Sequence, residues 1–248
     1  MLEVRDVVIR FGGVAAVDGA SITAPPGSIT GLIGPNGAGK TTLFNLIAGA
    51  IRPAAGAIRF EGRSLTRLPA ASRLALGLAR TFQIPHPFPE LTVLENLLVA
   101  APHGAMLAAA LTPGRTRARE LSACERAEGI LARLALRGLA GEPARVLSGG
   151  QRKLLELGRV LMARPRMILL DEPAAGVNPA LLETIGHHLA QLRDEGIGLL
   201  MVEHNMGFVA GLCDRVYAME SGRIIAEGSA TEVLADARVA ASYLGAAA

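Results

Sequence analysis

The chain has 248 residues, of which half are apolar, only 3% are aromatic and none is tryptophan, so its core has to be built from aliphatic side chains. This length suits one large domain or two modest ones. The formal net charge of +3 is too small a bias to indicate nucleic acid as a partner. Cys124 and Cys213 lie far apart without the spacing of metal ligands, and we expect reduced thiols.

Neither a signal peptide nor a membrane-spanning helix is expected from this sequence. Charged residues at positions 3, 5, 6 and 10 interrupt the first apolar segment. Residues 96–114 form a long stretch without Asp, Glu, Lys or Arg, but Pro102-His103-Gly104 breaks it and alanine fills much of the rest. A spanning helix needs about 20 strongly apolar residues. The composition is still compatible with docking onto an integral membrane partner.

A strand, a glycine-rich loop and a helix are expected in succession near the start of the chain. Ser28–Ile33 predicts a buried strand, and Lys40–Ala48 predicts a helix that ends at Gly49. The loop between them fits G-x-x-x-x-G-K-[ST], whose backbone N–H groups and helix N-terminus cradle phosphates. The residues expected to bind a nucleotide are Gly34, Pro35, Asn36, Gly37, Ala38, Gly39, Lys40, Thr41 and Thr42.

Lys40 is one of only two lysines among the 25 basic residues. A compact ammonium fits inside a ring of N–H groups, whereas a planar guanidinium suits most surface positions equally well. We therefore expect Lys40 to bridge the β- and γ-phosphates. The Thr41 hydroxyl is expected to ligate Mg²⁺.

The character of the chain changes between Ile84 and Leu147, where strand-like runs vanish and helical patterns such as Leu121–Leu139 are joined by proline and glycine. The three prolines within Ile84–Glu90 exclude a regular helix or a central strand, and the segment is expected to expose Ile84 and Phe88 on a stiff loop. An ordinary interdomain connector is the alternative interpretation. We predict one domain over residues 1–248, with a core of residues 1–85 and 152–248 and an inserted helical subdomain over about 86–151.

Strand patterns return in the last third of the chain. Short apolar runs alternate with amphipathic stretches such as Pro179–Arg193, which indicates an α/β fold with a parallel sheet and helices on both faces. Functional residues at the carboxyl ends of such strands lie where ligands bind. The expected strands are Met167–Glu172, Gly198–His204, Arg215–Glu220 and Arg223–Glu227, followed by an amphipathic tail over Ser229–Leu244.

Two acids end the run that begins at Met167. Asp171 suits a second Mg²⁺ anchor, and Glu172 beside it suits the base that polarises an attacking water. An Asp-Glu pair at a strand end is by itself often only a cap. Because the chain also carries a phosphate loop, we favour the catalytic interpretation.

Leu147-Ser148-Gly149-Gly150-Gln151 precedes that acidic strand. Ser148 is expected to cap a helix that starts near Gln151 and so to present a second anion-binding N-terminus. With the phosphate loop, the acid pair and His204 in this order, the whole chain resembles the ATP-binding-cassette (ABC) ATPases. The resemblance implies a P-loop NTPase of RecA-like architecture, with a parallel or mixed sheet and an inserted helical subdomain.

The resemblance also implies roles for individual residues. Gln83 would touch Mg²⁺ and water and couple to a membrane partner, and His204 would contact the γ-phosphate. Phe11 would stack on the adenine, although a core phenylalanine is the alternative. The catalytic set is therefore Glu172, His204 and Gln83, and the metal set is Thr41, Gln83 and Asp171. Two subunits of this family dimerise head to tail, so that Ser148, Gly149, Gly150 and Gln151 would complete the ATP site of the opposite subunit.

One segment departs from the family pattern. The dimer-contact loop after the acid pair usually ends in Leu-Asp, whereas here it ends in Val177-Asn178 before Pro179. Asparagine keeps the hydrogen-bonding shape of aspartate without its charge. The departure affects the expected communication between sites and leaves hydrolysis untouched.

Three stretches resemble one branch of the family, the ATPase subunits of branched-chain amino-acid importers. They are Ala79–Gln83, Glu172–Pro179 and Glu203–Met206 with the short helical tail. Importers of urea and short-chain amides share much of this pattern. The resemblance implies ATP and Mg²⁺ as cofactors, and integral membrane permease subunits with a second ABC ATPase subunit, identical or paralogous, as partners. It also implies an indirect solute-binding protein, no nucleic acid, and a place at the cytoplasmic face of the inner or plasma membrane.

Three other classes of function remain open at this stage. A lipid or exporter-type cassette would carry the same motifs. A soluble ABC ATPase acting on ribosomes or DNA is disfavoured, because such proteins usually carry two cassettes or long coiled-coil insertions. A nucleotide-binding module without turnover is disfavoured because Glu172 and His204 are both present.

Overall fold

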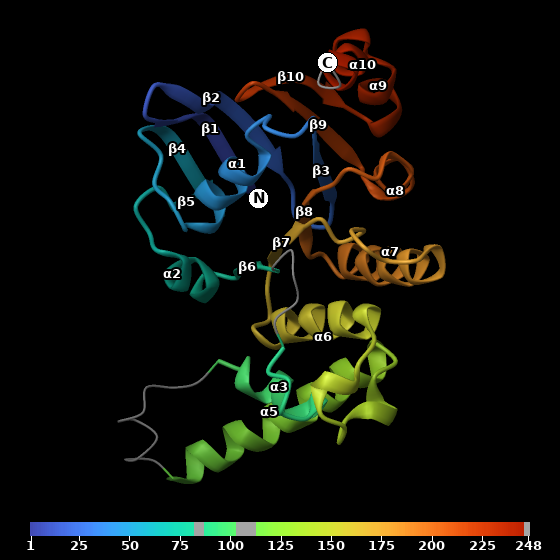
Figure 1. Cartoon of the computed structure of the whole chain (residues 1–248). Helices are drawn as coiled ribbons and strands as arrows, with labels where there is room; N and C mark the ends of the chain where they lie inside the picture. Colours follow the sequence, from blue (N-terminus) through green and yellow to red (C-terminus); the bar gives the residue numbers. More distant parts are fainter. Residues whose placement is uncertain (82–86, 103–112, 246–248) are drawn as a thin grey trace. The chain divides into compact units, whose positions relative to one another are not determined.

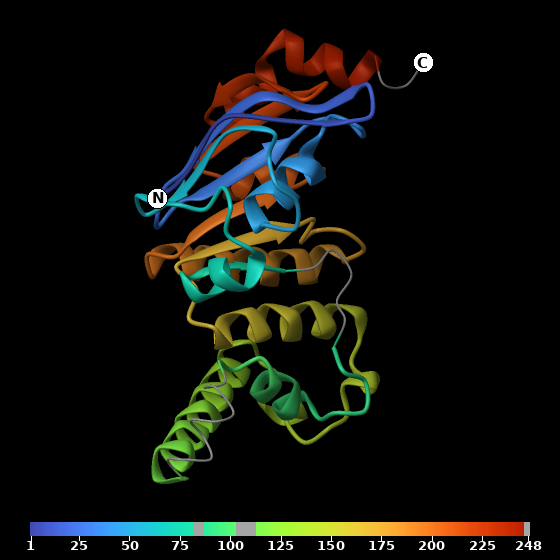
Figure 2. The same cartoon turned by 90° about the vertical axis from the view of Figure 1, so that its left-hand side faces the viewer.

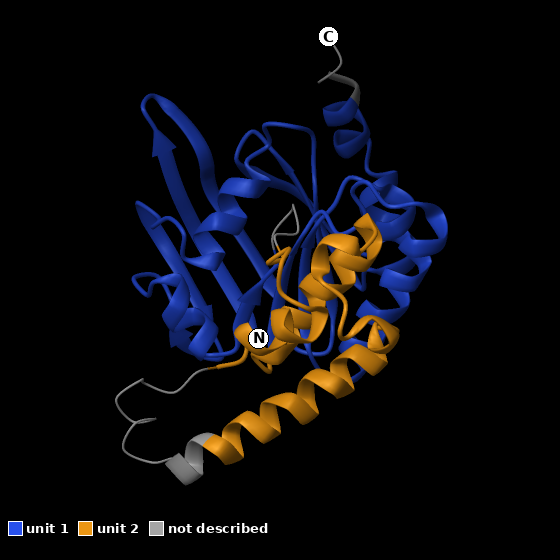
Figure 3. Ribbon diagram, turned by 60° about the horizontal axis from the view of Figure 1, so that its bottom comes forward, with its two compact units in different colours: residues 1–83, 166–248 blue, residues 84–165 orange. Residues whose placement is uncertain are grey.

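The computed structural model describes residues 1–81, 87–102 and 113–245 (Figure 1). The chain forms two compact units (Figure 3). Unit 1 comprises Met1–Gln83 and Arg166–Ala248, and unit 2 comprises Ile84–Pro165. Unit 2 runs on to Pro165, beyond the predicted end of the helical subdomain at residue 151. The reason is that α6 (Gly149–Met162) packs on α3 (Val93–Val99) and α5 (Pro113–Arg133).

The central sheet of unit 1 has six strands in the order β10-β9-β3-β8-β7-β6. All neighbours pair in parallel except β10, which runs antiparallel to β9, so the sheet is mixed. Every residue of β3, β7 and β8 is buried, and strands buried on both faces are written as continuous apolar runs. The bounds are β3 Ile29–Ile33, β6 Leu78–Arg80, β7 Met167–Asp171, β8 Gly198–Val202, β9 Arg215–Glu220 and β10 Arg223–Gly228.

A second, antiparallel sheet of unit 1 has the order β2-β1-β4-β5 and was not predicted from the sequence. Its longest strands alternate buried and exposed residues only in part. The pairing register of β1 shifts around Asp6 against both of its neighbours, β2 and β4. Asp6 has a φ of 47°, which marks a bulge in the strand. The bounds are β1 Leu2–Phe11, β2 Val14–Ala24, β4 Ala55–Phe60 and β5 Arg63–Ser64.

Helix α1 (Lys40–Ala48) joins the two sheets into one core (Figure 1). Leu43, Phe44, Leu46 and Ile47 of this helix are buried in a hydrophobic cluster that draws on strands of both sheets. Aliphatic side chains dominate the cluster, as the composition requires. The helix that carries the phosphate loop is therefore anchored along its whole length.

Arg73 secures the far end of α1. Its guanidinium is buried and donates to the carbonyl oxygens of Leu46 (2.7 Å), Ile47 (2.6 Å), Leu65 (2.7 Å) and Leu68 (2.9 Å). Burial lowers the pKa of Arg73 to about 10, so the group is still charged at neutral pH. A cation at a helix C-terminus is favourable, because the last carbonyl groups of a helix lack partners within it.

Of the remaining helices of unit 1, α7 packs on β8 (Figure 2). Cys213 is partly buried, with its Sγ close to Gly31, and this burial together with the nearby Asp214 and Glu203 raises the pKa of its thiol to about 12. Both cysteines are free, as expected. The bounds are α2 Ala70–Ala75, α7 Pro179–Asp194, α8 Met206–Leu212, α9 Ala230–Ala235 and α10 Ala237–Gly245.

Unit 2 is built from α3, α5 and α6 with two 3-10 turns, η1 (Arg137–Leu139) and η2 (Ala144–Val146). The helices approach closely at Gly158, where a Cβ would lie 3.0 Å from Leu97 Cδ2. The helical pattern predicted over Leu121–Leu139 is interrupted. Helix α5 ends at Arg133, because Ala135 takes a left-handed φ of 55°.

Among the described residues, no helix combines the length and the apolar character that crossing a bilayer requires.

Candidate active site

The glycine-rich loop leads from β3 to α1, with Gly39 as the residue before the helix. Gly34 has a φ of 149° and Gly39 a φ of 103°, which L side chains rarely adopt. A Cβ would also overlap the carbonyl oxygen of Met219 at Gly34 and that of Ala16 at Gly39. Both positions therefore require glycine, and the loop is pressed against β9 and β2.

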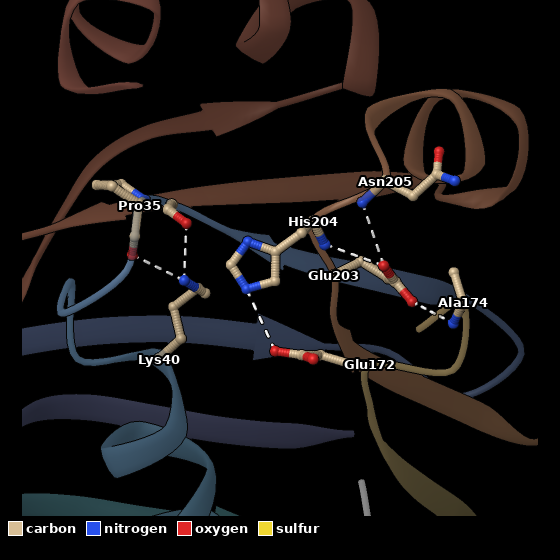
Figure 4. Close-up of polar contacts among 8 residues, drawn as sticks. Pro35, Lys40, Glu172, Ala174, Glu203, His204 and Asn205 are labelled. Atoms are coloured by element: carbon tan, nitrogen blue, oxygen red, sulfur yellow. Dashed lines mark hydrogen bonds and ion pairs between the residues drawn. The ribbon is translucent and has the colours of Figure 1, made fainter. Parts of the chain in front are cut away.

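The side chain of Lys40 turns back into this loop (Figure 4). Its Nζ donates to the carbonyl oxygens of Gly34 (2.7 Å) and Pro35 (2.8 Å), and the residue is only 6% exposed. Burial lowers the pKa of the ammonium, while the carboxylate of Glu172 acts in the opposite direction. The loop thus holds a positive charge at its centre, beside the first N–H groups of α1.

Glu172 and His204 face each other across the ends of two neighbouring strands. Glu172 follows β7 directly and has a φ of 49°, and His204 follows β8 after one residue. His204 Nε2 lies 3.2 Å from Glu172 Oε1 (Figure 4). Adjacent parallel strands end at the same edge, which is why residues 32 positions apart in the printed sequence meet here.

Glu203 is a buried carboxylate that the sequence analysis did not single out. Oε1 accepts from the N–H of Ala174 (2.6 Å), and Oε2 accepts from the N–H groups of His204 (2.9 Å) and Asn205 (3.2 Å) (Figure 4). These bonds fix both the turn after Glu172 and the backbone of His204. The available signal was an acid that ends an apolar run immediately before a histidine.

Asp171 ends β7 and is bound by Arg80, whose Nη2 donates to Oδ2 at 2.6 Å. Arg80 Nη1 donates to Asn45 Oδ1 on α1, also at 2.6 Å. Asn45 lies one turn beyond Thr41 on the same face of the helix. Sequence reasoning found Asp171 and missed Arg80 and Asn45 as its setting, since neither belongs to a motif with a stated role.

A cavity of about 460 Å³ lies within unit 1 and brings together seven residues of the predicted phosphate loop with Glu172 and His204, whereas Gly34, Pro35 and Asp171 are not among its lining residues. Its size falls within the usual range for small-molecule sites. The phosphate loop faces the acid–histidine pair across it. The lining residues are Val14, Ala15, Ala16, Asn36, Gly37, Ala38, Gly39, Lys40, Thr41, Thr42, Glu172, His204 and Ser221.

Several predicted residues lie elsewhere. Phe11 is 54% exposed and does not line the cavity, but it pairs with the lining residue Val14 in the β1–β2 hairpin. It is not a core residue. Gln83 lies outside the described residues, as does Ile84. Ser221, with a φ of 47°, is a lining residue that the sequence analysis missed.

Ser148 caps α6 in unit 2, and the helix begins at Gly149 rather than near Gln151. Ser148 Oγ accepts from the Gln151 N–H (3.3 Å), and Gln151 Oε1 accepts from the Ser148 N–H (2.9 Å). This capping box orders the start of the helix. Gly149 and Gly150 form its first turn, so a helix N-terminus lies at the predicted place, and its binding of an anion stays a prediction.

Asn178, the departure from the family loop, caps α7. Its Oδ1 accepts from the Leu181 N–H at 2.9 Å, and Pro179 occupies the first helical position. The amide therefore has a local structural role in this chain.

The comparisons with known proteins agree with this geometry. A family model described as ABC transporter matches residues 17–175, more than half of the chain. The chain belongs to the ABC transporter family. A second ABC model, described as branched-chain amino acid ATP-binding cassette transporter, matches residues 223–248. The prediction of an ABC ATPase is thereby confirmed.

Two curated relatives of the ABC family match over nearly the full length. One is the "Probable branched-chain amino acid transport ATP-binding protein LivG" of Methanocaldococcus jannaschii, 41% identical over 99% of this chain and 97% of the relative. Another is the "High-affinity branched-chain amino acid transport ATP-binding protein LivG" of Salmonella typhimurium, 38% identical over 99% and 98%.

A solved ABC structure also resembles the chain closely. It is the ADP conformation of an ATP-binding cassette of an ABC transporter, 39% identical with a TM-score of 0.85 over 99% of this chain and 98% of that one. The predicted ABC architecture is confirmed, and the chain is an ATPase of the ABC type with a nucleotide-binding site.

Proposed function

We propose that the chain is the ATP-hydrolysing subunit of an ABC importer and that the solute is a branched-chain amino acid. The observation that carries the enzymatic part is the cavity in which the phosphate loop faces Glu172 and His204. The solute is supported by relatives named for branched-chain amino acid transport and by the match of residues 223–248.

The residues present fit ATP with Mg²⁺. Gly34 and Gly39 keep side chains out of the loop, which opens its N–H groups to phosphate oxygens, and the Lys40 ammonium neutralises the β- and γ-phosphates. The Thr41 hydroxyl and the Asp171 carboxylate would hold the Mg²⁺, together with Gln83. Bound ATP would supply the phosphoryl group, and Mg²⁺ would neutralise part of the negative charge of that group. Arg80 holds Asp171 toward α1.

Glu172 acts as the general base that orients a water and accepts its proton. His204 lies within hydrogen-bonding distance of the Glu172 carboxylate, so it holds that carboxylate. As a residue that lines the same cavity as the phosphate loop, it would contact the γ-phosphate of a bound ATP. Glu203 accepts from the N–H groups of Ala174 and His204, so it fixes the backbone of His204 relative to the turn after Glu172. Phe11, exposed at the hairpin beside the cavity, supplies an aromatic surface for the adenine.

Ser148, with Gly149, Gly150 and Gln151, contributes a helix N-terminus to the ATP held by a second cassette. This requires a head-to-tail dimer with an identical or paralogous subunit. Unit 2 also exposes Phe88, 46% accessible, on the loop before α3. We assign this loop to the contact with an integral membrane permease, which places the chain at the cytoplasmic face of the membrane. A solute-binding protein acts indirectly, through the permease, and no nucleic acid takes part.

Reconstitution tests the whole proposal. The subunit would be purified with its native permease subunits, placed in liposomes with ATP and Mg²⁺, and given labelled leucine, isoleucine or valine in parallel with urea and acetamide. ATP-dependent uptake of the amino acids alone is the expected result. Uptake of urea or acetamide instead would reassign the solute, and ATP-driven efflux would reject the importer.

A further inference from the structure

Asn96, at the centre of α3, is fully buried and uses its side-chain amide on one short segment. Its Oδ1 accepts from the Phe88 N–H at 2.8 Å. Its Nδ2 donates to the carbonyl oxygens of Phe88 (3.0 Å), Leu91 (3.2 Å) and Thr92 (3.0 Å). One amide therefore fixes the backbone of residues 88–92, here called the Phe88 loop.

The Phe88 loop is also bonded to the segment that precedes Ser148. The Arg145 N–H donates to the Pro89 carbonyl oxygen (3.1 Å), and the Ala144 N–H donates to that of Leu91 (2.9 Å). Thr92 forms an antiparallel bridge with Pro143. Three residues after Arg145, Ser148 begins the capping box of α6. The Phe88 loop is thus hydrogen-bonded to residues 143–145, which lead in the chain to the start of α6.

The ring of Phe88 is placed by α6 as well. The Arg159 guanidinium lies 5.4 Å from the ring centroid, and Arg159 Nη1 donates to the buried carboxylate of Glu156 at 2.9 Å. A cation over an aromatic face is favourable and restricts the ring. Asn96 holds the backbone of Phe88 and Arg159 lies over its ring, yet the residue remains exposed. An ordered, exposed aromatic side chain suits a contact with a partner.

We propose that Asn96 is the positioning residue of the Phe88 loop and that it joins permease contact to the placement of Ser148. The inference rests on the proposed function, because it takes the Phe88 loop as the part that meets the permease. A displacement of the loop would pass through residues 143–145 to the first turn of α6. Asn96 itself touches neither nucleotide nor partner.

The test is a double-mutant cycle in the assembled transporter, with permease-stimulated ATP hydrolysis and permease affinity as readouts. Asn96→Asp has the same shape but turns an oxygen toward three carbonyl oxygens, so the loop should lose its position. We expect stimulation to fall about tenfold or more, with ATP affinity of the isolated subunit near wild type. Phe88→Ala should lose a similar amount, and the double variant should lose no more than the larger single loss.

Leu131→Ala is the matched control, since it removes a buried side chain of α5 in the same unit. When its loss of Tm equals that of Asn96→Asp, Leu131→Ala should keep the permease-stimulated ATP hydrolysis of the wild type. Wild-type stimulation in Asn96→Asp, multiplied losses in the double variant, or an equal loss in Leu131→Ala would each overturn the role of Asn96. Were Phe88→Ala itself without effect, the assignment of the permease contact would fall, and this inference with it.

Discussion

The two units position their functional side chains by different means. In unit 1, strand ends and left-handed backbone place Lys40, Glu172 and His204 around one cavity. In unit 2, polar side chains clamp short helices and loops, as Asn96 and the Ser148–Gln151 capping box do. Backbone at the ends of sheet strands gives unit 1 a rigid site. Side-chain hydrogen bonds, in contrast, hold a segment of unit 2 together while allowing it to move as one body.

The two units also differ in the exposure of their functional side chains. Lys40, Asp171 and Glu203 are buried within unit 1, while Phe88, Val146 and Ser148 are exposed on unit 2. Unit 1 is therefore organised for chemistry on a small ligand. Under the proposed function the exposed residues of unit 2 contact other chains, so substitutions there should alter coupling more than nucleotide binding.

The largest effects are expected at the cavity of unit 1. Glu172→Gln should keep ATP binding and lose turnover by roughly 10²–10⁴-fold, because it removes the general base. Lys40→Ala should abolish tight nucleotide binding, because it removes the charge at the centre of the loop. Steady-state hydrolysis and nucleotide titration of the assembled complex measure both. Wild-type turnover in Glu172→Gln would remove Glu172 from the base role.

Mixing two variants tests whether unit 2 serves the site of another chain. Ser148→Arg chains mixed with Lys40→Ala chains should give heterodimers with one intact composite site and one doubly broken site. ATP-dependent dimer closure, followed by light scattering after size exclusion, should survive in the mixture and vanish in each variant alone. Mixed dimers that never close, under conditions where wild type does, would show that Ser148 acts within its own chain.

Arg73→Met should destabilise unit 1 by about 3 kcal/mol, because four carbonyl oxygens, two at the end of α1 and two at Leu65 and Leu68, would lose their buried donor. The midpoint of urea unfolding measures the loss. Arg5→Met is the control, since the Arg5 side chain is 66% exposed and paired only at the surface with Glu3, and its cost should stay below about 1 kcal/mol. Equal costs for the two would deny Arg73 its anchoring role.

Phe88→Asp should weaken permease binding about tenfold or uncouple transport, because it puts a charge on the contact surface, while ATP affinity of the isolated subunit stays near wild type. Val99→Asp is the matched control: Val99 ends α3 in the same unit and is 48% exposed. Affinity for the permease can be measured in detergent by surface plasmon resonance. Normal uptake by a complex carrying Phe88→Asp contradicts the assignment.

Arg145→Gln should have the smallest effect. The Arg145 side chain pairs only with Glu90 at 2.8 Å, and both are largely exposed. Its backbone N–H, which bonds to Pro89, is retained in the variant. Tm should change by less than about 2 °C and coupling should be unchanged. A marked loss of coupling would mean that the side chain, and not the backbone ladder, carries the connection in unit 2.

Local sequence determined much of this protein. The largely apolar runs of β3, β7 and β8 identified strands buried on both faces, and the loop motif between β3 and Lys40 identified a phosphate site, because both patterns are complete within a few residues. Ser148 could be recognised as a helix cap for the same reason. Residues at the ends of parallel strands could be brought together by topology alone.

Only the tertiary structure decided the rest. The antiparallel sheet depends on register shifts around Asp6, which no periodicity shows. Arg73, Arg80, Glu203 and Asn96 bond partners from 1 to 91 positions away in the chain. Their types are common on protein surfaces, so composition and spacing do not distinguish them. A buried polar group acquires its role from the donors and acceptors that folding brings to it, and those are fixed by the packing of whole elements.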